Sequence, residues 1–110
     1  MSEDATLIKV LKNEDVAKVI AFIPHGHVHT RLMIILKSGD ILILQHATVD
    51  GIIRAFTSVS LHPTRRAFEL VCKYISKVKR KPGFAEWQLV ESGRNESDIL
   101  NEVARFLENS

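Results

Sequence analysis

The sequence is poor in cysteine, glycine and long apolar runs, and each shortage excludes a class of protein. Cys72 is the only cysteine of the 110 residues, so no disulfide can form within the chain and a reducing compartment is the simplest setting. The five glycines stand singly, without the Gly-rich spacing of phosphate or dinucleotide loops. No apolar run approaches the about 20 residues of a membrane-spanning helix. The acidic stretch Met1–Asp4 is unlike a signal peptide. We therefore expect a cytoplasmic protein with no membrane partner.

Charge and length narrow the choice further. The formal net charge is +2, too small for overall charge to indicate a nucleic-acid partner. Hydrophobic residues make up 45% of the chain, enough for a core without disulfides or metal at this length. We expect a single domain over residues 1–110.

The stretch from His25 to Leu61 shows the clearest pattern, that of three consecutive antiparallel strands. Asp50-Gly51, between two runs of alternating apolar residues, is typical of a tight hairpin turn. Residues 37–40 fit a second turn, of type I, in which Gly39 adopts a left-handed conformation and forms a bulge. The two turns together predict the register of the sheet and therefore its faces.

The predicted faces differ in character. The core face would carry Val28, Leu32, Ile34, Leu36, Leu42, Leu44, His46, Ile53, Ala55, Val59 and Leu61. The opposite face would carry Met33, Ile35, Ile41, Ile43 and Phe56 at one end and His29, Arg31, Gln45 and Arg54 at the other. A face that is half apolar needs a cover, from the N-terminal segment or from a second subunit.

The flanking segments complete the expected fold. Residues 5–11 and 16–23 fit strands through their β-branched content, although helical spacing is also present and the choice stays open. Residues 64–79 and the stripe Ile99, Val103, Phe106 and Leu107 have helical spacing, and 84–90 alternates as a strand does. The pattern predicts an α+β fold: an antiparallel β-meander of about four to six strands, with two amphipathic C-terminal helices packed on one face.

Three histidines form the only metal-like pattern. His25, His27 and His29 alternate, so neighbouring ones would point the same way along an extended strand and could converge on a divalent ion such as zinc. The outer two would lie about 13 Å apart in a fully extended segment. Further ligands would have to come from elsewhere, and capping of a polar strand end is the alternative role.

No catalytic residues are indicated. Cys72 lies between apolar and basic neighbours in the predicted helix 64–79, where a buried core thiol is the default. No serine has the glycine pattern of a nucleophile elbow. The sequence therefore favours a non-catalytic role.

We expect a binding or interaction domain that self-associates, as a homodimer, through the open sheet face. Its ligand-binding residues would be His27, His29, Arg31, Gln45 and Arg54, a polar surface suited to an anionic small molecule. A metal site at the three histidines is the first alternative. Nucleic-acid binding through Arg31 and Arg54, or through the basic run 77–81, is the second.

Overall fold

The fold combines two small antiparallel sheets with two helices, which confirms the predicted α+β class. The structure is a computed structural model, and it describes residues 9–76 and 86–108. The elements are a 3₁₀ turn η1 (Asn13–Asp15), β1 (Val16–Phe22), β2 (Arg31–Leu36), β3 (Ile41–Leu44), α1 (His46–Ser60), β4 (Leu70–Tyr74), β5 (Trp87–Glu91) and α2 (Glu96–Glu108). The five strands fall within the predicted four to six, but they divide into a three-stranded meander β1-β2-β3 and a separate pair β4-β5.

The hairpin between β2 and β3 forms as predicted. Gly39 has a φ of 100°, a left-handed conformation that a residue without Cβ adopts at little cost. The Leu36 N–H donates a hydrogen bond of 2.9 Å to the carbonyl oxygen of Asp40, which closes the turn. Ile34 lies opposite Leu42, and Ile35 opposite Ile41, so the predicted assignment of residues to the two faces holds for these strands.

The segment before this hairpin is also a strand, which settles the choice left open by the sequence. β1 pairs antiparallel with β2 and ends at Phe22, two residues before Pro24. Of the other segment with ambiguous spacing, residues 5–8 lie outside the described part of the chain, and 9–11 form neither helix nor strand.

The predicted hairpin at Asp50-Gly51 is wrong, because residues 46–60 form helix α1. The segment carries both periodicities, and helical hydrogen bonding prevails over the turn signal of this dipeptide. The covered side of the helix includes a row of small residues, Thr48, Gly51, Ala55 and Ser58, three or four positions apart, and Val49, Thr57 and Val59 beside them are also half-buried. The sequence pattern predicted mainly large apolar residues on the core face of a sheet, so this row of small residues on a helix was not predicted.

The first of the two expected helices is therefore misplaced in the sequence. Residues 64–69 have no regular structure, and residues 70–74 form strand β4; 77–79 lie outside the described residues. β4 pairs with β5, which confirms the predicted strand near Trp87. Tyr74 lies opposite Trp87, and their ring centroids are 5.5 Å apart in an edge-on arrangement, which adds to the pairing.

The C-terminal helix α2 forms where its apolar stripe predicts. The Asn95 side-chain oxygen accepts a 2.9 Å hydrogen bond from the Asp98 N–H, and so caps the first turn. Glu96 and Asp98 in the first turn and Arg105 in the last complement the helix dipole.

A polar joint formed by Glu69, Arg94 and Glu96 ties α2 to the chain before β4. Arg94 makes a two-pronged ion pair with Glu69, at 2.9 and 3.0 Å. The Glu96 carboxylate accepts hydrogen bonds from the backbone N–H groups of Arg66, at 2.6 Å, and Ala67, at 3.1 Å. The hydrogen bond from Arg94 holds the pKa of Glu69 below its ordinary value, and the two backbone donors do the same for Glu96.

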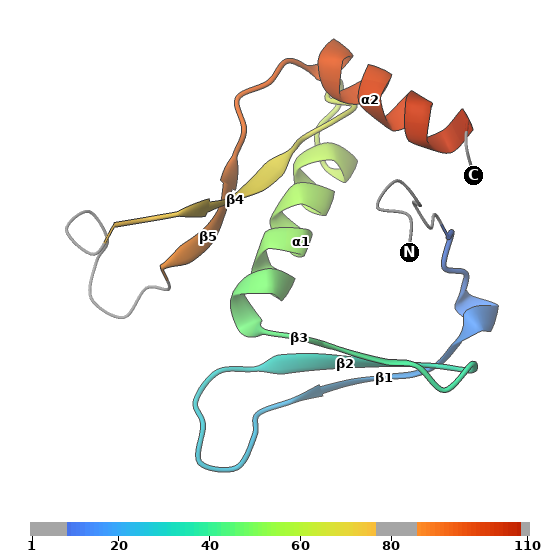
Figure 1. Cartoon of the computed structure of the whole chain (residues 1–110), viewed down its shortest axis with the longest axis vertical. Helices are drawn as coiled ribbons and strands as arrows, with labels where there is room; N and C mark the ends of the chain where they lie inside the picture. The colour runs from blue at the N-terminus through green and yellow to red at the C-terminus, as the bar shows by residue number, and fades with distance from the viewer. Residues whose placement is uncertain (1–8, 77–85, 109–110) are drawn as a thin grey trace, which may run out of the picture.

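Figure 1 shows an open arrangement: the meander lies at the start of α1, the β4-β5 pair lies beside the helix, and α2 lies near its other end. The radius of gyration of the whole chain is 16.7 Å, whereas a compact domain of this length has about 13 Å. Among residues 9–76 and 86–108, Ile99 is the only apolar side chain that is buried, at 8% exposure.

We predict that acid weakens the attachment of α2. Both glutamates have a folded pKa below the unfolded value of about 4.3, so their contribution is complete above that value and is lost as the pH falls through the folded pKa. Glu96→Gln should be less stable than the unmodified protein at pH 7, and its stability should fall less between pH 5 and pH 3. Urea unfolding at several pH values measures both; parallel pH profiles would contradict the assignment.

A second prediction concerns the close approach of α1 to β5. A Cβ placed on Gly51 would lie 2.6 Å from a terminal methyl carbon of Leu89, so only glycine fits without rearrangement. Gly51→Val should destabilise the fold by about 1–3 kcal/mol through overpacking. Ala47→Val, at an exposed position one turn earlier, should cost no more than about 0.7 kcal/mol. Equal costs in urea denaturation would show that this contact is unimportant.

Candidate functional site

The most conspicuous feature of the described residues is an apolar surface that is exposed to water. Nineteen large apolar or aromatic side chains of the described residues are exposed. Those on the meander are Val19, Ile20, Ile41, Leu42 and Ile43. Val19 and Leu42 lie on one face with Ile34, and Ile20, Ile41 and Ile43 lie on the other face with Met33 and Ile35. Both faces of the meander are therefore open in part, including the face expected to lie beneath the helices.

Helix α1 adds to this surface. Small residues and two half-buried valines, Val49 and Val59, are on its covered side, and its larger apolar residues Ile52, Ile53 and Phe56 are exposed. Phe56 is 70% exposed. It was expected on the open sheet face; it is exposed, but on a helix. Monomers rarely expose contiguous apolar patches beyond a few hundred Å², and larger ones mark interaction sites.

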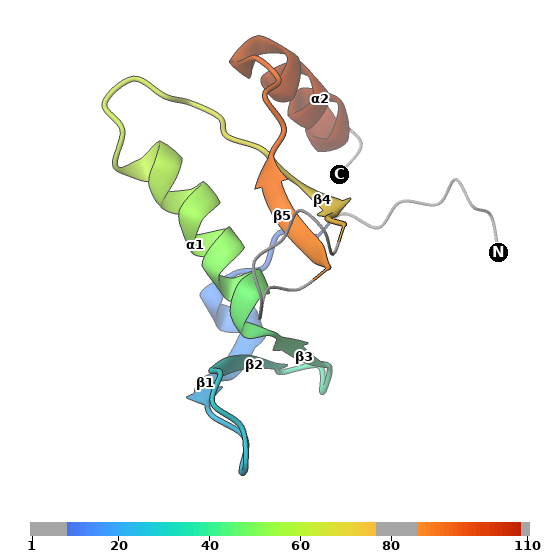
Figure 2. The same ribbon diagram turned by 90° about the vertical axis from the view of Figure 1, so that its left-hand side faces the viewer.

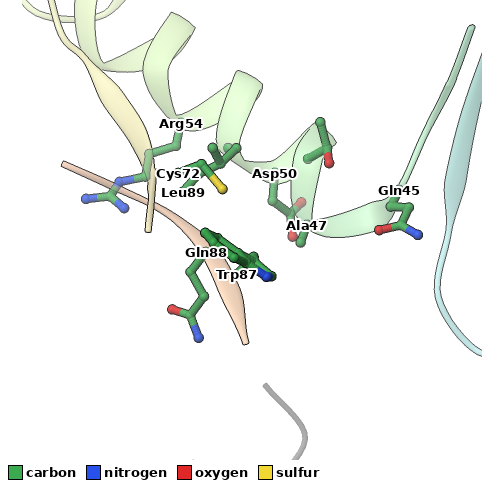
Figure 3. A pocket seen from close by; sticks show the side chains of 10 residues that line it. Gln45, Ala47, Asp50, Arg54, Cys72, Trp87, Gln88 and Leu89 are labelled. Atoms are coloured by element: carbon green, nitrogen blue, oxygen red, sulfur yellow. The ribbon is translucent and has the colours of Figure 1, made fainter. Parts of the chain in front are cut away.

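A cavity of 530 Å³ lies between the first turns of α1 and the β4-β5 pair (Figure 3). Its walls are formed by Gln45, Ala47, Thr48, Asp50, Gly51, Arg54, Cys72, Trp87, Gln88 and Leu89. Two of the five expected ligand-binding residues, Gln45 and Arg54, are among them. Cys72 and Trp87 were not expected there, because the sequence placed Cys72 in the core of a helix. The one feature of the sequence that could have indicated this part of the cavity is the single tryptophan, Trp87, in the predicted strand 84–90.

The chemistry of the cavity is mixed. Arg54 is its only cationic side chain and Asp50 its only acidic one, while Gln45 and Gln88 supply amides. Figure 3 shows Arg54 and Gln45 at opposite ends of the site. Nine helical positions separate the two, about 13 Å along the axis, so a small anion can contact one of them but not both.

The Arg54 guanidinium is also held by an aromatic ring. Its central carbon lies 5.7 Å from the centroid of the Phe68 ring, and that of Arg65 lies 5.5 Å from the same centroid. A cation over an aromatic face is attracted by the quadrupole of the ring, which restricts both arginines to the region around Phe68. His62 orders the backbone beside them, because its Nδ1 accepts hydrogen bonds from the N–H groups of Thr64 and Arg65.

The histidines are brought together differently from the expected pattern. His29 lies beside His46, with ring centroids 5.4 Å apart, although His46 was assigned to the other face. His46 Nε2 is 3.1 Å from Asp50 Oδ2, one helical turn along, and Asp50 lines the cavity. His29 is thereby linked to the cavity wall through His46. No described contact links His27 or Arg31 to the cavity; His27 lies in the exposed β1-β2 loop, and half-buried Arg31 begins β2 opposite Phe22.

Neither alternative function gains a preformed site. Within residues 9–76 and 86–108, no three histidine, cysteine or acidic side chains are grouped closely enough to hold a metal ion. Zinc bound by His25, His27 and His29 therefore stays a prediction. For nucleic-acid binding, Arg31 and Arg54 lie on different elements, and the basic run 77–81 lies outside the described residues.

Two further findings bear on the class of protein. Neither described helix has the length and hydrophobicity of a transmembrane segment. Comparisons with protein-family models, with curated proteins and with solved structures find no match for this chain.

Proposed function

We propose that this protein is a small, non-catalytic binding and interaction domain that self-associates as a homodimer through the open sheet face, and that it binds an anionic ligand in the cavity beside Arg54. The exposed isoleucines and leucines of the meander and of α1 carry the first part of the proposal. Each large aliphatic side chain that is removed from water contributes about 1.5–3 kcal/mol. A chain with one buried apolar side chain among its described residues gains much of this free energy only by association.

The exposed area is large enough for an obligate interface. The whole chain has an accessible surface of 9118 Å², whereas a compact monomer of 12.4 kDa exposes about 6,100 Å². The excess of about 3,000 Å² is an upper limit on what association covers, because it also counts the residues outside the described ranges. Obligate dimers bury about 2,000–5,000 Å² over both partners, or half of this per chain. The excess therefore accommodates one dimer interface.

The composition of the surface favours a second copy as the partner. The core of an interface between identical chains is richer in apolar residues and poorer in charge than the rest of a protein surface. The exposed row Ile41, Leu42 and Ile43 has this composition. A twofold axis places the same apolar patch on both partners, so no complementary charge is required.

The anionic ligand is proposed from Arg54. Arg54 contributes a positive charge to a cavity that also offers amide groups and the flat face of exposed Trp87. Asp50, one helical turn from Arg54, disfavours an elongated ligand that carries negative charge along its whole length, whereas a small anion can still contact Arg54. An elongated ligand with one anionic end at Arg54 and a neutral polar end near Gln45 fits this distribution of charge.

We predict that the protein is a dimer in solution. Light scattering and sedimentation should give twice the chain mass of 12.4 kDa at micromolar concentration. The double substitution Ile41→Glu and Ile43→Glu places charges on one face of β3 and should shift the mass to that of one chain. Asn101→Glu, at an exposed position on α2, adds charge elsewhere and should leave the dimer intact. A strict monomer at high concentration would refute self-association.

We predict that the cavity binds inorganic phosphate, used here as a probe of its cationic end. Trp87 is the only tryptophan and lines the cavity, so its fluorescence should change saturably on titration. Arg54→Gln should weaken this binding about tenfold or more, because a charge-assisted hydrogen bond contributes about 1.5–3 kcal/mol. Arg105→Gln, on α2, serves as the charge-matched control and should bind as the unmodified protein does. Equal loss in both variants would indicate nonspecific screening.

A further inference from the structure

At the edge of β3, a second copy of the chain can form hydrogen bonds with the backbone as well as apolar contacts with the side chains. β3 is the outermost strand of the meander, with β2 on its one paired side (Figure 2). It consists of Ile41, Leu42, Ile43 and Leu44 and contains no charge and no proline. Of the described strands it is the only one without a charged residue. An open, apolar edge of this kind is a template for pairing with another strand.

The opposite edge of the same sheet, formed by β1, is protected against pairing with another strand, unlike the edge of β3. β1 carries Lys18, and its register against β2 shifts between Val16 and Lys18, as at a β-bulge. Lysine and bulges are two of the devices by which proteins keep an edge strand from pairing. The chain therefore blocks one edge of the meander and leaves the other available.

The hydrogen-bond alternation shows which groups β3 presents. The Leu36 N–H donates to the Asp40 carbonyl, and the Leu36 carbonyl accepts from the Gly39 N–H, so Leu36 makes its ladder bonds toward this turn and β3. Hydrogen-bonded pairs alternate along an antiparallel ladder, so Leu42 and Leu44 bond toward β2, and the N–H and C=O groups of Ile41 and Ile43 point to the open edge. Each copy thus presents two donors and two acceptors.

We propose that the β3 strands of two copies pair antiparallel about a twofold axis at Leu42. This inference specifies the partner surface of the proposed self-association and rests on it. Placing Ile41 opposite Ile43 of the second copy, and Ile43 opposite its Ile41, joins all eight outward groups in four hydrogen bonds. The axis is perpendicular to the sheet, so each face of one meander continues into the same face of the other. The product is a continuous six-stranded sheet with an all-apolar centre.

This register predicts the distances between equivalent Cα atoms of the two copies. The two Leu42 residues face each other as a non-hydrogen-bonded pair, whose Cα atoms lie about 4.5 Å apart. Ile43 is offset from its own equivalent by two residues, which places those Cα atoms about 8 Å apart. A disulfide needs Cα atoms within about 7 Å, so it can form at position 42 and not at position 43.

Disulfide trapping tests the pairing in the full chain. Single cysteines are placed at Leu42, at Ile43 and at Val19 in a Cys72→Ser background, and are oxidised in a glutathione redox buffer at micromolar concentration. Leu42→Cys should give a covalent dimer in high yield. Ile43→Cys is the register control, with similar exposure on the neighbouring position, and Val19→Cys reports chance collisions from the far strand. Both controls should cross-link at least tenfold more slowly. Light scattering on each reduced variant shows whether the dimer itself is retained.

The outcomes separate the two proposals. Preferential cross-linking at Leu42→Cys supports the pairing. A dimer in light scattering that cross-links no faster at 42 than at 19, or faster at 43, overturns the β3 pairing and leaves self-association standing. A reduced background protein that is monomeric at high concentration overturns both. Circular dichroism of each reduced variant identifies any substitution that disturbs the fold of the chain. If Leu42→Cys does so, light scattering on Leu42→Ala shows whether loss of the leucine side chain alone abolishes the dimer.

Discussion

The contact between α1 and β5 determines how the two sheets of this protein are held relative to each other. Gly51 lets the helix backbone approach Leu89 so closely that a methyl group at this position would overlap it. Thr48, Ala55 and Ser58 continue a row of small, half-buried residues along the helix. Ile52, Ile53 and Phe56 of the same helix are exposed to water. Self-association is the proposed answer to this exposure.

Polar contacts complete the arrangement where apolar packing is thin. Glu69, Arg94 and Glu96 fix α2 to the chain that leads into β4, at a place where few apolar side chains are covered. Exposed ion pairs contribute little stability when isolated, but backbone hydrogen bonds to Glu96 and the two-pronged geometry at Arg94 make this group a defined joint. Folding of one chain and association of two would then be closely linked, as in obligate dimers.

The cavity and the proposed interface use different parts of the same helix. Arg54 and Asp50 belong to the side that faces β5, and Phe56 belongs to the exposed side. A ligand in the cavity would contact the strand that carries Trp87, and a second copy would contact the meander. The proposed binding site and the proposed interface are thus separate, although both depend on the position of α1.

Local signals made part of the fold predictable. Gly39 has the positive φ that its turn needs, and Pro24 follows the end of β1, because such residues act through their own backbone. The apolar stripe of α2 was equally clear. The prediction failed at Asp50-Gly51, because the residues around this dipeptide fit either a hairpin or a helix. It also failed at residues 64–79, where the apolar residues have helical spacing but Leu70–Tyr74 pair as strand β4. For the site, Gln45 and Arg54 were foreseen and meet in one cavity, whereas Trp87 and Cys72 were not.

The sequence by itself determined the α+β class, the hairpin at Gly39, the strand near Trp87 and the C-terminal helix, since these follow from turn chemistry and periodicity within a few residues. Only the tertiary structure decided that residues 46–60 form a helix. Leu89 of β5 provides the surface against which a helix with glycine near its centre can pack. The tertiary structure also decided which apolar residues stay uncovered. Burial depends on what lies on the other side of a face, and no local pattern contains that information.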